Sequence, residues 1–591
     1  MQPALTPWPL RVLLGRVARE WETRHRIFDL PSGKFHHNDP TADLSAMLGG
    51  RRVATPIGPA AGPHTQLAQN IVLGWLAGAR VFELKTVQVL DELEIPRPCI
   101  DVEGVGYNVE WSQELRIAES LEEYVKAWMA LAILGEWEPL RPVIGTPGPH
   151  LFDMSVGYDL AGIQSGAMAG FISGLLDASE VIDRLRPEIP DPFAAWRDFA
   201  FPTRVVGGVT LSTFHGCPPD EIEAIARHLM TEYGLDVVVK LNPTLLGVDA
   251  VGAILRRLGH EGVVLDPDAF AADLQYGRAL EMIRSLREFA SANGRTVGIK
   301  LTNTLVVRNQ RGRLPGDTMY LSGKPLHAIA VTLLDRLVGD LGGLLGVGPE
   351  PGPVPVSFSA GIDRDNVSEA VALGMAPVTV CTALLKPGGF GNLSAMLHTL
   401  AKDMHEAGCP TIPDLVRYRD LAAWESGHRD AVAAYAATLA GEEGVRRYGV
   451  AASTPRLRSV DRDLQTWDCV SCNLCVTVCP NDAMLHLATP AGLGMTEKWQ
   501  YLCLAEWCND CGNCTTFCPE RGDPSRVKPR VFLDREAFVL DGGPGYLMTV
   551  RDGALAMEAR GPADPSDPGH MAAFLTGDEG FPVRAGDLVA G

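Results

Sequence analysis

Two runs of four cysteines late in the chain have the spacing most specific for a known chemistry. Both runs have the form C-x₂-C-x₂-C-x₃-C-P, and they begin at Cys469 and Cys508. Repeated spacing of this kind holds a pair of [4Fe–4S] clusters, in which the fourth cysteine of each run binds the cluster of the other run. The expected ligands are Cys469, Cys472, Cys475 and Cys518 for the first cluster, and Cys508, Cys511, Cys514 and Cys479 for the second.

Disulfides and structural zinc explain this pattern less well. Disulfides do not require a repeated spacing, and zinc sites usually end at two cysteine pairs rather than two runs of four. Cys503 lies between the runs without an assigned role. Of the four other cysteines, Cys99, Cys381 and Cys409 are expected to be small core residues.

The segment before the cysteines alternates short β-rich stretches with helical ones. Helical stretches such as Pro219–Tyr233 and Ala271–Asn293 separate most of the predicted strands. Repeated strand–helix units imply parallel strands, and about eight of them in about 350 residues predict an α/β fold, a (β/α)₈ barrel over residues 51–401. The predicted strands are Val53–Ile57, Arg80–Leu84, Leu151–Val156, Val205–Ser212, Asp236–Leu241, Thr296–Leu301, Val354–Ala360 and Pro377–Cys381.

In such a barrel the chemistry lies at the C-terminal ends of the strands. Lysines follow or end several predicted strands, notably Lys85 and Lys240. A lysine buried there needs an anionic partner, because an unpaired ammonium away from water is costly. The partner can be a reduced flavin or an ordinary loop carboxylate. Lys300 has a sequence context similar to that of Lys240, so the sequence alone does not separate these two lysines.

These features together predict FMN at the barrel mouth. Glycine-containing turns and helix N-termini can hold its phosphate, and a nearby lysine stabilises the negative charge of the reduced ring. The sequence has no usable dinucleotide fingerprint, since Gly342–Gly346 lacks both the spacing and a preceding strand. We therefore expect electrons to arrive from a separate protein.

Composition limits the remaining possibilities. The chain of 591 residues has a formal net charge of −20, which argues against nucleic acid or an anionic membrane as a partner. No export signal and no apolar run of about 18 residues is evident. Together with oxygen-sensitive clusters, this predicts a cytoplasmic location.

The other segments have less distinctive sequences. Residues 1–50 are expected to form a helical extension, 402–464 a helical connector, and 465–535 an α+β domain of the bacterial ferredoxin type with two [4Fe–4S] clusters. Residues 536–591 form a tail rich in Gly, Pro and Asp. Two late strands are predicted, Val531–Leu533 and Ala537–Leu540.

Several stretches resemble the dihydroorotate and dihydropyrimidine dehydrogenases. Within that group, the sequence more specifically resembles large bacterial oxidoreductases of the selenate reductase iron–sulfur subunit type. These are linked to reduction of purines such as urate. It rests on both cysteine runs and on the following stretches: Thr55–His64, Glu83–Gln88, Tyr107–Glu110, Val239–Pro243, Thr302–Thr304, Leu321–Gly323, Ser359–Asp363 and Cys381–Ala383.

The resemblance implies roles for residues at these positions. The implied FMN-binding residues are Ala61, Gly62, Lys85, Thr86, Asn108, Lys240, Asn303, Thr304, Gly323, Ala360, Gly361, Thr382 and Ala383. His64 and Asn242 are implied on the substrate side, although each can equally be an ordinary loop residue.

Two departures from the family pattern matter. The similar large oxidoreductases carry a FAD/NAD(P)H-binding module between barrel and clusters, which the short segment 402–464 cannot contain. We therefore expect a separate electron-input subunit resembling the small subunit of glutamate synthase, in an oligomeric assembly. The loop that carries a catalytic cysteine in dihydropyrimidine dehydrogenases is compressed here to residues 213–218, so Cys217 and His215 are alternative proton donors.

The predicted activity is FMN-dependent reduction of a nitrogen heterocycle, either a pyrimidine or a purine such as urate. The electrons would pass through the two clusters. Two alternatives stay open: an electron-transfer or scaffold subunit whose barrel is catalytically silent, and a dehydrogenase that works in the oxidative direction.

Overall fold

Eight parallel strands form the central barrel of the protein. The computed structural model describes residues 5–38, 41–91, 93–109, 112–212, 215–454, 457–561, 567–576 and 581–588. The barrel strands, in the order in which they pair, are β5 (Ile57–Pro59), β18 (Val378–Val380), β17 (Val354–Phe358), β13 (Val297–Leu301), β11 (Asp236–Leu241), β10 (Val206–Leu211), β9 (Leu151–Val156) and β6 (Val81–Glu83). The predicted (β/α)₈ fold is confirmed, although the first strand begins at Ile57 rather than at Val53.

A glycine allows the first and last strands of this order to meet. The backbone N–H of Arg80, just before β6, donates to the carbonyl of Ile57 in β5 over 3.1 Å. A Cβ on Gly58 would lie only 1.6 Å from the Val81 carbonyl oxygen, so no other residue fits at this position. The missing side chain at Gly58 therefore lets β5 and β6 approach closely enough to complete the barrel.

Helices surround the barrel, and one of them begins later than its sequence pattern indicates. Helix α8 (Pro219–Glu232) and helix α12 (Lys324–Leu341) follow strands β10 and β15 along the chain. The predicted helix Ala271–Asn293 is wrong at its start, because α10 (Pro267–Ala272) ends before α11 (Tyr276–Ala292) begins. Gln275 contributes to this break, since its Nε2 donates to the Asp273 carbonyl over 2.7 Å. The break leaves Asp273 outside both helices.

A second sheet lies over the C-terminal end of the barrel. Its five antiparallel strands are, in order, β12 (Val264–Leu265), β14 (Leu305–Arg308), β15 (Thr318–Ser322), β8 (Gly106–Asn108) and β7 (Ile100–Asp101). These strands come from three separate loops of the barrel. The sheet therefore fixes loops that would otherwise be independent.

The segment between barrel and cysteines is helical and packs on the barrel. It contains α15 (Ile412–Glu425), α16 (Ala431–Ala440), α17 (Glu442–Tyr448) and α18 (Val450–Ser453). His327 of α12 stacks on Tyr448 with ring centroids 5.0 Å apart and lies within 2.8 Å of the Tyr435 hydroxyl. These helices therefore extend the barrel's own core.

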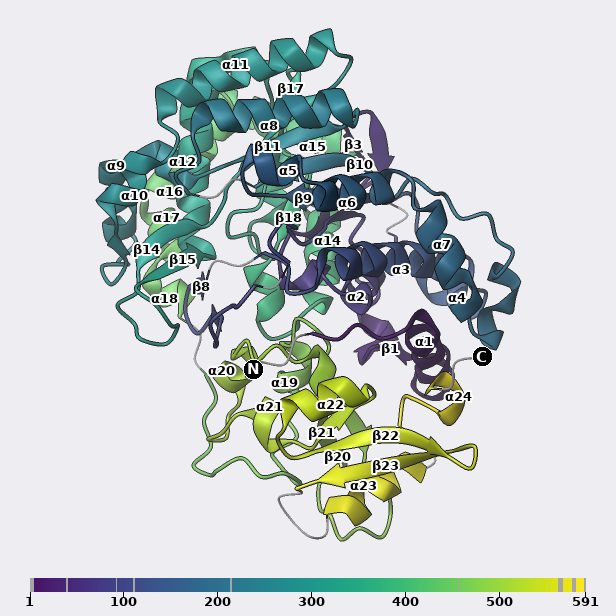
Figure 1. The fold of residues 1–591 in the computed structure, drawn as a ribbon. Coiled ribbons are helices and arrows are strands. Elements are labelled where there is room, and N and C mark those ends of the chain that lie inside the picture. Colours follow the sequence, from purple (N-terminus) through teal and green to yellow (C-terminus); the bar gives the residue numbers. More distant parts are fainter. Residues whose placement is uncertain are drawn as a thin grey trace.

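The cysteine runs belong to a smaller α+β domain, drawn in yellow-green below the barrel in Figure 1. Its sheet has the order β19 (Met484–Ala488), β20 (Trp499–Leu504), β21 (Arg530–Phe532), β22 (Gly545–Arg551) and β23 (Ala554–Arg560). The predicted strand Ala537–Leu540 is wrong, because these residues lie in helix α22 (Arg535–Asp541), where Asp534 accepts a capping hydrogen bond from the Ala537 N–H. The β22–β23 hairpin continues the sheet beyond residue 535.

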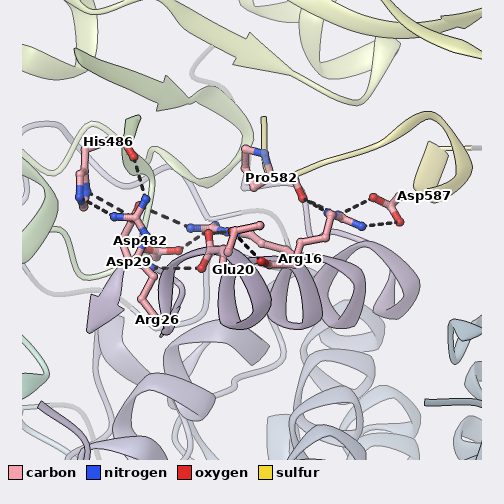
Figure 2. A network of polar contacts seen from close by, with 10 residues as sticks. Arg16, Glu20, Arg26, Asp29, Asp482, His486, Pro582 and Asp587 are labelled. Carbon is pink, nitrogen blue, oxygen red and sulfur yellow. Dashed lines mark hydrogen bonds and ion pairs between the residues drawn. The ribbon is translucent and has the colours of Figure 1, made fainter. Parts of the chain in front are cut away.

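Helix α1 (Leu10–Arg24) lies between the barrel and the cluster domain (Figure 1). Its Arg16 is completely buried and forms ion pairs with Glu20 at 2.6 Å and with Asp482 of the cluster domain at 2.9 Å. Asp29 and Arg26 complete the group, and Arg26 Nη1 lies 2.5 Å from His486 Nε2. Figure 2 shows these side chains converging from the N-terminal segment and the cluster domain. The two parts of the molecule therefore share a buried ionic network.

Replacing Arg16 by methionine should strongly destabilise the docked cluster domain. The change leaves Glu20 and Asp482 buried without their cation and Asp29 with Arg26 as its remaining arginine, and breaking a buried ion pair in this way typically costs about 3–5 kcal/mol. Urea unfolding followed by tryptophan fluorescence measures the loss. Arg521→Ala is the control, because Arg521 is 60% exposed and its pairing partner Asp461 is 98% exposed. Equal unfolding curves for R16M and the unaltered protein would show that the network adds no stability.

Among the described residues, no helix is both long and apolar enough to cross a bilayer.

Candidate functional site

A pocket of about 460 Å³ opens at the C-terminal ends of the barrel strands. Its walls come from the strand ends and from the overlying sheet, which contributes Ile100, Tyr107 and Tyr320. Most of the residues predicted for this site line it. These are Ala61, Gly62, Lys85, Thr86, Asn108, His215, Lys240, Asn303, Thr304, Gly323, Gly361 and Thr382.

One side of the pocket is formed by glycines at a helix N-terminus. Gly323, with a φ of 80°, immediately precedes α12. A Cβ on Gly361, whose φ is 57°, would lie 2.3 Å from the Gly323 carbonyl oxygen. Ser322 and Thr382 place their hydroxyl oxygens 2.9 Å apart at the same edge. The first backbone N–H groups of a helix have no intrahelical acceptor, so this side suits a phosphate.

Lysines make the base of the pocket cationic. Lys85 and Lys240 both line it. Lys300 is fully buried, pairs with Glu83 and donates from Nζ to Thr379 Oγ1 over 2.8 Å. Burial lowers the pKa of Lys85 to about 8, although nearby Glu114 partly offsets this effect. Lys240 therefore has access to a bound molecule, whereas Lys300 neutralises a carboxylate inside the barrel.

His215 is held in the pocket by an aspartate. Its Nδ1 lies 2.8 Å from Asp273 Oδ2. Asp273 also accepts hydrogen bonds from Gly216 N–H at 2.7 Å, Thr244 Oγ1 at 2.7 Å and Asn242 Nδ2 at 3.1 Å. Burial by itself would raise the pKa of Asp273, but the hydrogen bonds, led by the one from His215, lower it overall.

This arrangement fixes the tautomer of the imidazole. An ionised carboxylate only accepts hydrogen bonds, so Nδ1 carries the proton that donates to Asp273. Nε2 of His215 is buried and has no hydrogen-bond partner in the structure. His215 can therefore offer Nε2 to a molecule in the pocket, with Asp273 stabilising the imidazolium form.

Five predicted site residues do not contribute to the pocket wall. Cys217 is 3% exposed, and burial, followed by the negative charges of Glu221 and Asp159, raises its pKa to about 12. Residues 213 and 214 of the same loop lie outside the described residues. The other four are Asn242, His64, Ala360 and Ala383.

Asn242 and His64 have visible structural roles. Asn242 supports Asp273 through the hydrogen bond given above. His64 packs edge-on against Phe390 with ring centroids 5.2 Å apart, and burial lowers its pKa to about 3. His64 is therefore a neutral core histidine.

The structure brings the cysteines together in two groups, each of which draws one member from the other run. Cys469, Cys472, Cys475 and Cys518 border one small cavity. In the second group, burial and then the neighbouring Cys508 raise the pKa of Cys479 to about 12. Cys479 and Cys508 also act on Cys514, and Cys479 acts on Cys511, so the second group has the membership that the spacing predicts, while cluster binding by either group stays a prediction.

The residues described contain no cluster of His, Cys, Asp or Glu suited to a single metal ion. This finding does not decide the case for [4Fe–4S] clusters. Four different iron atoms bind the four cysteines of such a cluster, which therefore stand farther apart than the ligands of one ion. Burial raises the pKa of thiols in both groups, including Cys475 and Cys514, so metal binding must displace their protons.

The second cysteine group lies against the pocket. The N–H of Ile100, a pocket residue, donates to the Cys511 carbonyl over 3.1 Å. Asn513 Nδ2 donates over 2.8 Å to the carbonyl of Leu385, another pocket residue. The cavity of the first group, in contrast, is lined only by residues between Leu464 and Lys528. The second group is therefore the one nearer the barrel.

Two contributors to this site were missed by the sequence reasoning. Asp273 lies within an apparently continuous helical pattern, which gives no sign of the break between α10 and α11. Ile100 lies in a two-residue strand, β7, whose pairing with β8 depends on the distant β15. Neither residue follows a predicted strand end.

Comparisons with known proteins extend this description. The sequence model of the family described as "Oxidoreductase YgfK, N-terminal TIM-barrel domain" matches residues 28–426. Proteins of Escherichia coli K12 and O157:H7 that are named YgfK and assigned as oxidoreductases are each 40% identical over 421 residues. The match covers 68% of this chain and 39% of each relative, so the chain spans about two fifths of their length.

Solved structures of the dihydroorotate dehydrogenase DHODH from Eimeria tenella are also similar. The ligand-free form has 16% sequence identity and a TM-score of 0.42, covering 68% of this chain and 97% of that one. The complex with ferulenol has 14% identity and a TM-score of 0.40, covering 70% and 96%. At these scores the likeness adds nothing to the barrel described above. The sequence match from residue 28 to residue 426 is decisive: the chain belongs to the family of the oxidoreductase YgfK N-terminal TIM-barrel domain.

Proposed function

We propose that the protein is an FMN-dependent reductase of a nitrogen heterocycle, such as a pyrimidine or an oxidised purine, that receives electrons through two [4Fe–4S] clusters. The observation that carries the proposal is the direct contact between the second cysteine group and the pocket, made by the Ile100–Cys511 hydrogen bond. A redox pocket without a neighbouring electron relay would not need this contact.

The pocket fits FMN in two independent respects. The glycine turn at Gly323 and Gly361 would offer space and backbone N–H groups to a phosphate, and Lys85 and Lys240 would supply positive charge to the reduced ring. Bound FMN would supply hydride transfer to the substrate and one-electron exchange with the clusters.

The chain's own residues would bind, orient and protonate the substrate. Asn108, Asn303 and Thr304 offer amide and hydroxyl groups that can pair with the edge of a heterocycle. His215 would donate a proton from Nε2 to the reduced ring, and Asp273 would keep the imidazole oriented and stabilise its charged form. The overlying sheet would exclude water from the reacting atoms.

We further propose a separate FAD/NAD(P)H-binding flavoprotein as the electron donor. Helices α15–α18 occupy most of the segment between barrel and clusters and pack on the barrel, and the described part of this segment contains no nucleotide-binding module. Electrons would enter at the first cysteine group, pass to the second and reach the pocket.

Anaerobic reconstitution with iron, sulfide and FMN tests this function. We expect about eight iron atoms and about one FMN per chain. Absence of FMN would contradict the proposal. Titration with candidate rings then gives the direction, since reoxidation of pre-reduced protein by an unsaturated ring supports reduction and bleaching by a saturated ring supports the opposite. No response to any purine or pyrimidine would favour a silent barrel.

The affinity for reduced FMN should fall as the pH rises from about 7 to about 9. The ammonium of Lys85, with a pKa of about 8, is protonated below this range and loses its charge above it. The loss should weaken binding by about tenfold, the size of one hydrogen bond to a charged group. Anaerobic fluorescence titration of the apoprotein measures it. Lys85→Met should bind weakly at both pH values, and an unchanged pH dependence in this variant would assign the effect elsewhere.

A further inference from the structure

A single buried carboxylate connects the pocket to the cluster domain. The side chain of Glu114 is 5% exposed and pairs with Arg97. Asn509 Nδ2 donates to its two oxygens over 2.9 and 3.2 Å, and Gln66 Nε2 donates over 3.0 Å. Two segments of the barrel and one segment of the cluster domain therefore meet at Glu114.

On the cluster side, the contacts of this pair lead to the second cysteine group. Asn509 directly follows Cys508 in the sequence. Arg97 Nη1 lies 2.7 Å from Cys99 Sγ, and the Cys99 N–H donates to the Cys511 carbonyl over 3.3 Å. Glu114 therefore contacts the residue next to the predicted ligand Cys508, and Arg97 contacts a residue that is hydrogen-bonded to the predicted ligand Cys511.

On the pocket side, the same charges act on Lys85. Glu114 is the strongest of the groups that raise the pKa of Lys85, and Arg97 lowers it. Lys85 lines the pocket beside the proposed flavin. Because these side chains are largely buried, solvent screens their charges less than it screens surface charges.

Reduction adds negative charge on both sides of this pair. The second cluster becomes more negative when it takes up one electron. The flavin becomes more negative when it takes up two electrons and fewer than two protons. Both charges would lie near Glu114 and Arg97. We propose that Glu114 and Arg97 jointly set the midpoint potentials of the flavin and the second cluster, Glu114 lowering both and Arg97 raising both. This inference rests on the proposed function, because it requires that both groups bind.

A purely structural clamp would act differently from a pair of opposing charges. If the pair only holds the barrel and the cluster domain together, losing either residue weakens the same contact. Both variants would then change the potentials in the same direction or not at all. Loss of one charge at a time should instead move the potentials in opposite directions.

The test compares Glu114→Gln with Arg97→Gln in the full chain loaded with FMN and iron. Spectroelectrochemistry measures the flavin, and redox titration followed by EPR measures the clusters. We expect E114Q to favour the reduced flavin by about tenfold, which corresponds to about 30 mV for a two-electron couple, and R97Q to disfavour it by a similar factor. The potential of the second cluster should move with that of the flavin.

Two further variants complete the design. Glu114→Asp keeps the charge and should retain the original potentials, even if its contacts are looser. Glu103→Gln is the matched control, because Glu103 pairs with Arg313 in a nearby loop where the two side chains are 30% and 49% exposed. The flavin and cluster potentials of E103Q should equal those of the unaltered protein, since solvent screens this pair.

The outcomes separate the two hypotheses. Failure of the unaltered protein to bind FMN or clusters would refute the proposed function. Normal loading with potentials that do not move, or that move in the same direction in E114Q and R97Q, would refute the role of the pair. If E114Q does not fold, the R97Q variant decides alone. The inference requires the midpoint potentials to fall in R97Q, so potentials that rise or stay unchanged overturn it.

Discussion

Replacing Cys511 by alanine should disconnect the pocket from the electron supply while leaving the first cysteine group functional. Cys511 belongs to the group that contacts the pocket, and its carbonyl accepts the hydrogen bond from Ile100. Iron content should fall from about eight to about four atoms per chain. Rapid mixing with a reduced protein donor should then reduce the first cluster, while the flavin absorbance stays at its oxidised level.

Cys475→Ala is the matched variant in the other group. It should also lose about four iron atoms. Electrons placed on the flavin by photoreduction should still reach the second cluster in this variant, and they should not do so in C511A. The opposite pattern would reverse the proposed order of the two clusters. Near-equal flavin reduction in both variants would show that the clusters are not on the path to the pocket.

Replacing His215 by asparagine should lower the rate of substrate reduction by about 10²–10⁴-fold, the usual contribution of a positioned general acid. Asparagine keeps a polar side chain near Asp273 but offers no acid comparable to an imidazolium. FMN content and the rate of flavin reduction should be preserved, because neither uses the proton that His215 would donate to the substrate. Single-turnover oxidation of the pre-reduced protein by a heterocycle isolates this step.

Cys217→Ala provides the comparison for this prediction. The Cys217 thiol is buried outside the pocket wall and its pKa is raised to about 12, so we expect its removal to leave the single-turnover rate within a few-fold of the original. A large loss in C217A with a normal rate in H215N would identify the cysteine as the proton donor. The single-turnover rate of Asp273→Asn should lie between those of H215N and C217A, because this change disturbs the tautomer of His215 but retains the imidazole ring.

The barrel was largely predictable because its signal is local. Buried parallel strands are short apolar runs followed by polar loops, and seven of the eight predicted strands contain their observed counterparts completely. The first strand was placed four residues too early, because the closing contact at Gly58 depends on Val81 in another strand. That contact is not visible in either stretch alone.

The site was predictable where it follows strand ends and not where it depends on tertiary contacts. Lys85 and Lys240 follow or end strands and line the pocket, as expected. Lys300 has a sequence context similar to that of Lys240 but a different environment, because Glu83 from a separate strand reaches it. Asp273 was hidden because a break in a helix, stabilised by the side chain of Gln275, leaves no trace in the apolar pattern. The ligands of the two clusters and the roles of the FMN-binding residues stay predictions.

The position of α1 has a consequence for the order of events during biosynthesis. Arg16 leaves the ribosome early, but its partner Asp482 is made only after the whole barrel, and it lies three residues beyond a predicted cluster ligand, Cys479. Until the cysteine-rich domain has folded and acquired its iron, the part of α1 around Arg16 lacks the cluster-domain surface that covers it, although Trp21 of the same helix already packs on Trp137. A shortage of iron in the cell would therefore expose the first helix to proteases, and maturation of the clusters would protect the opposite end of the chain.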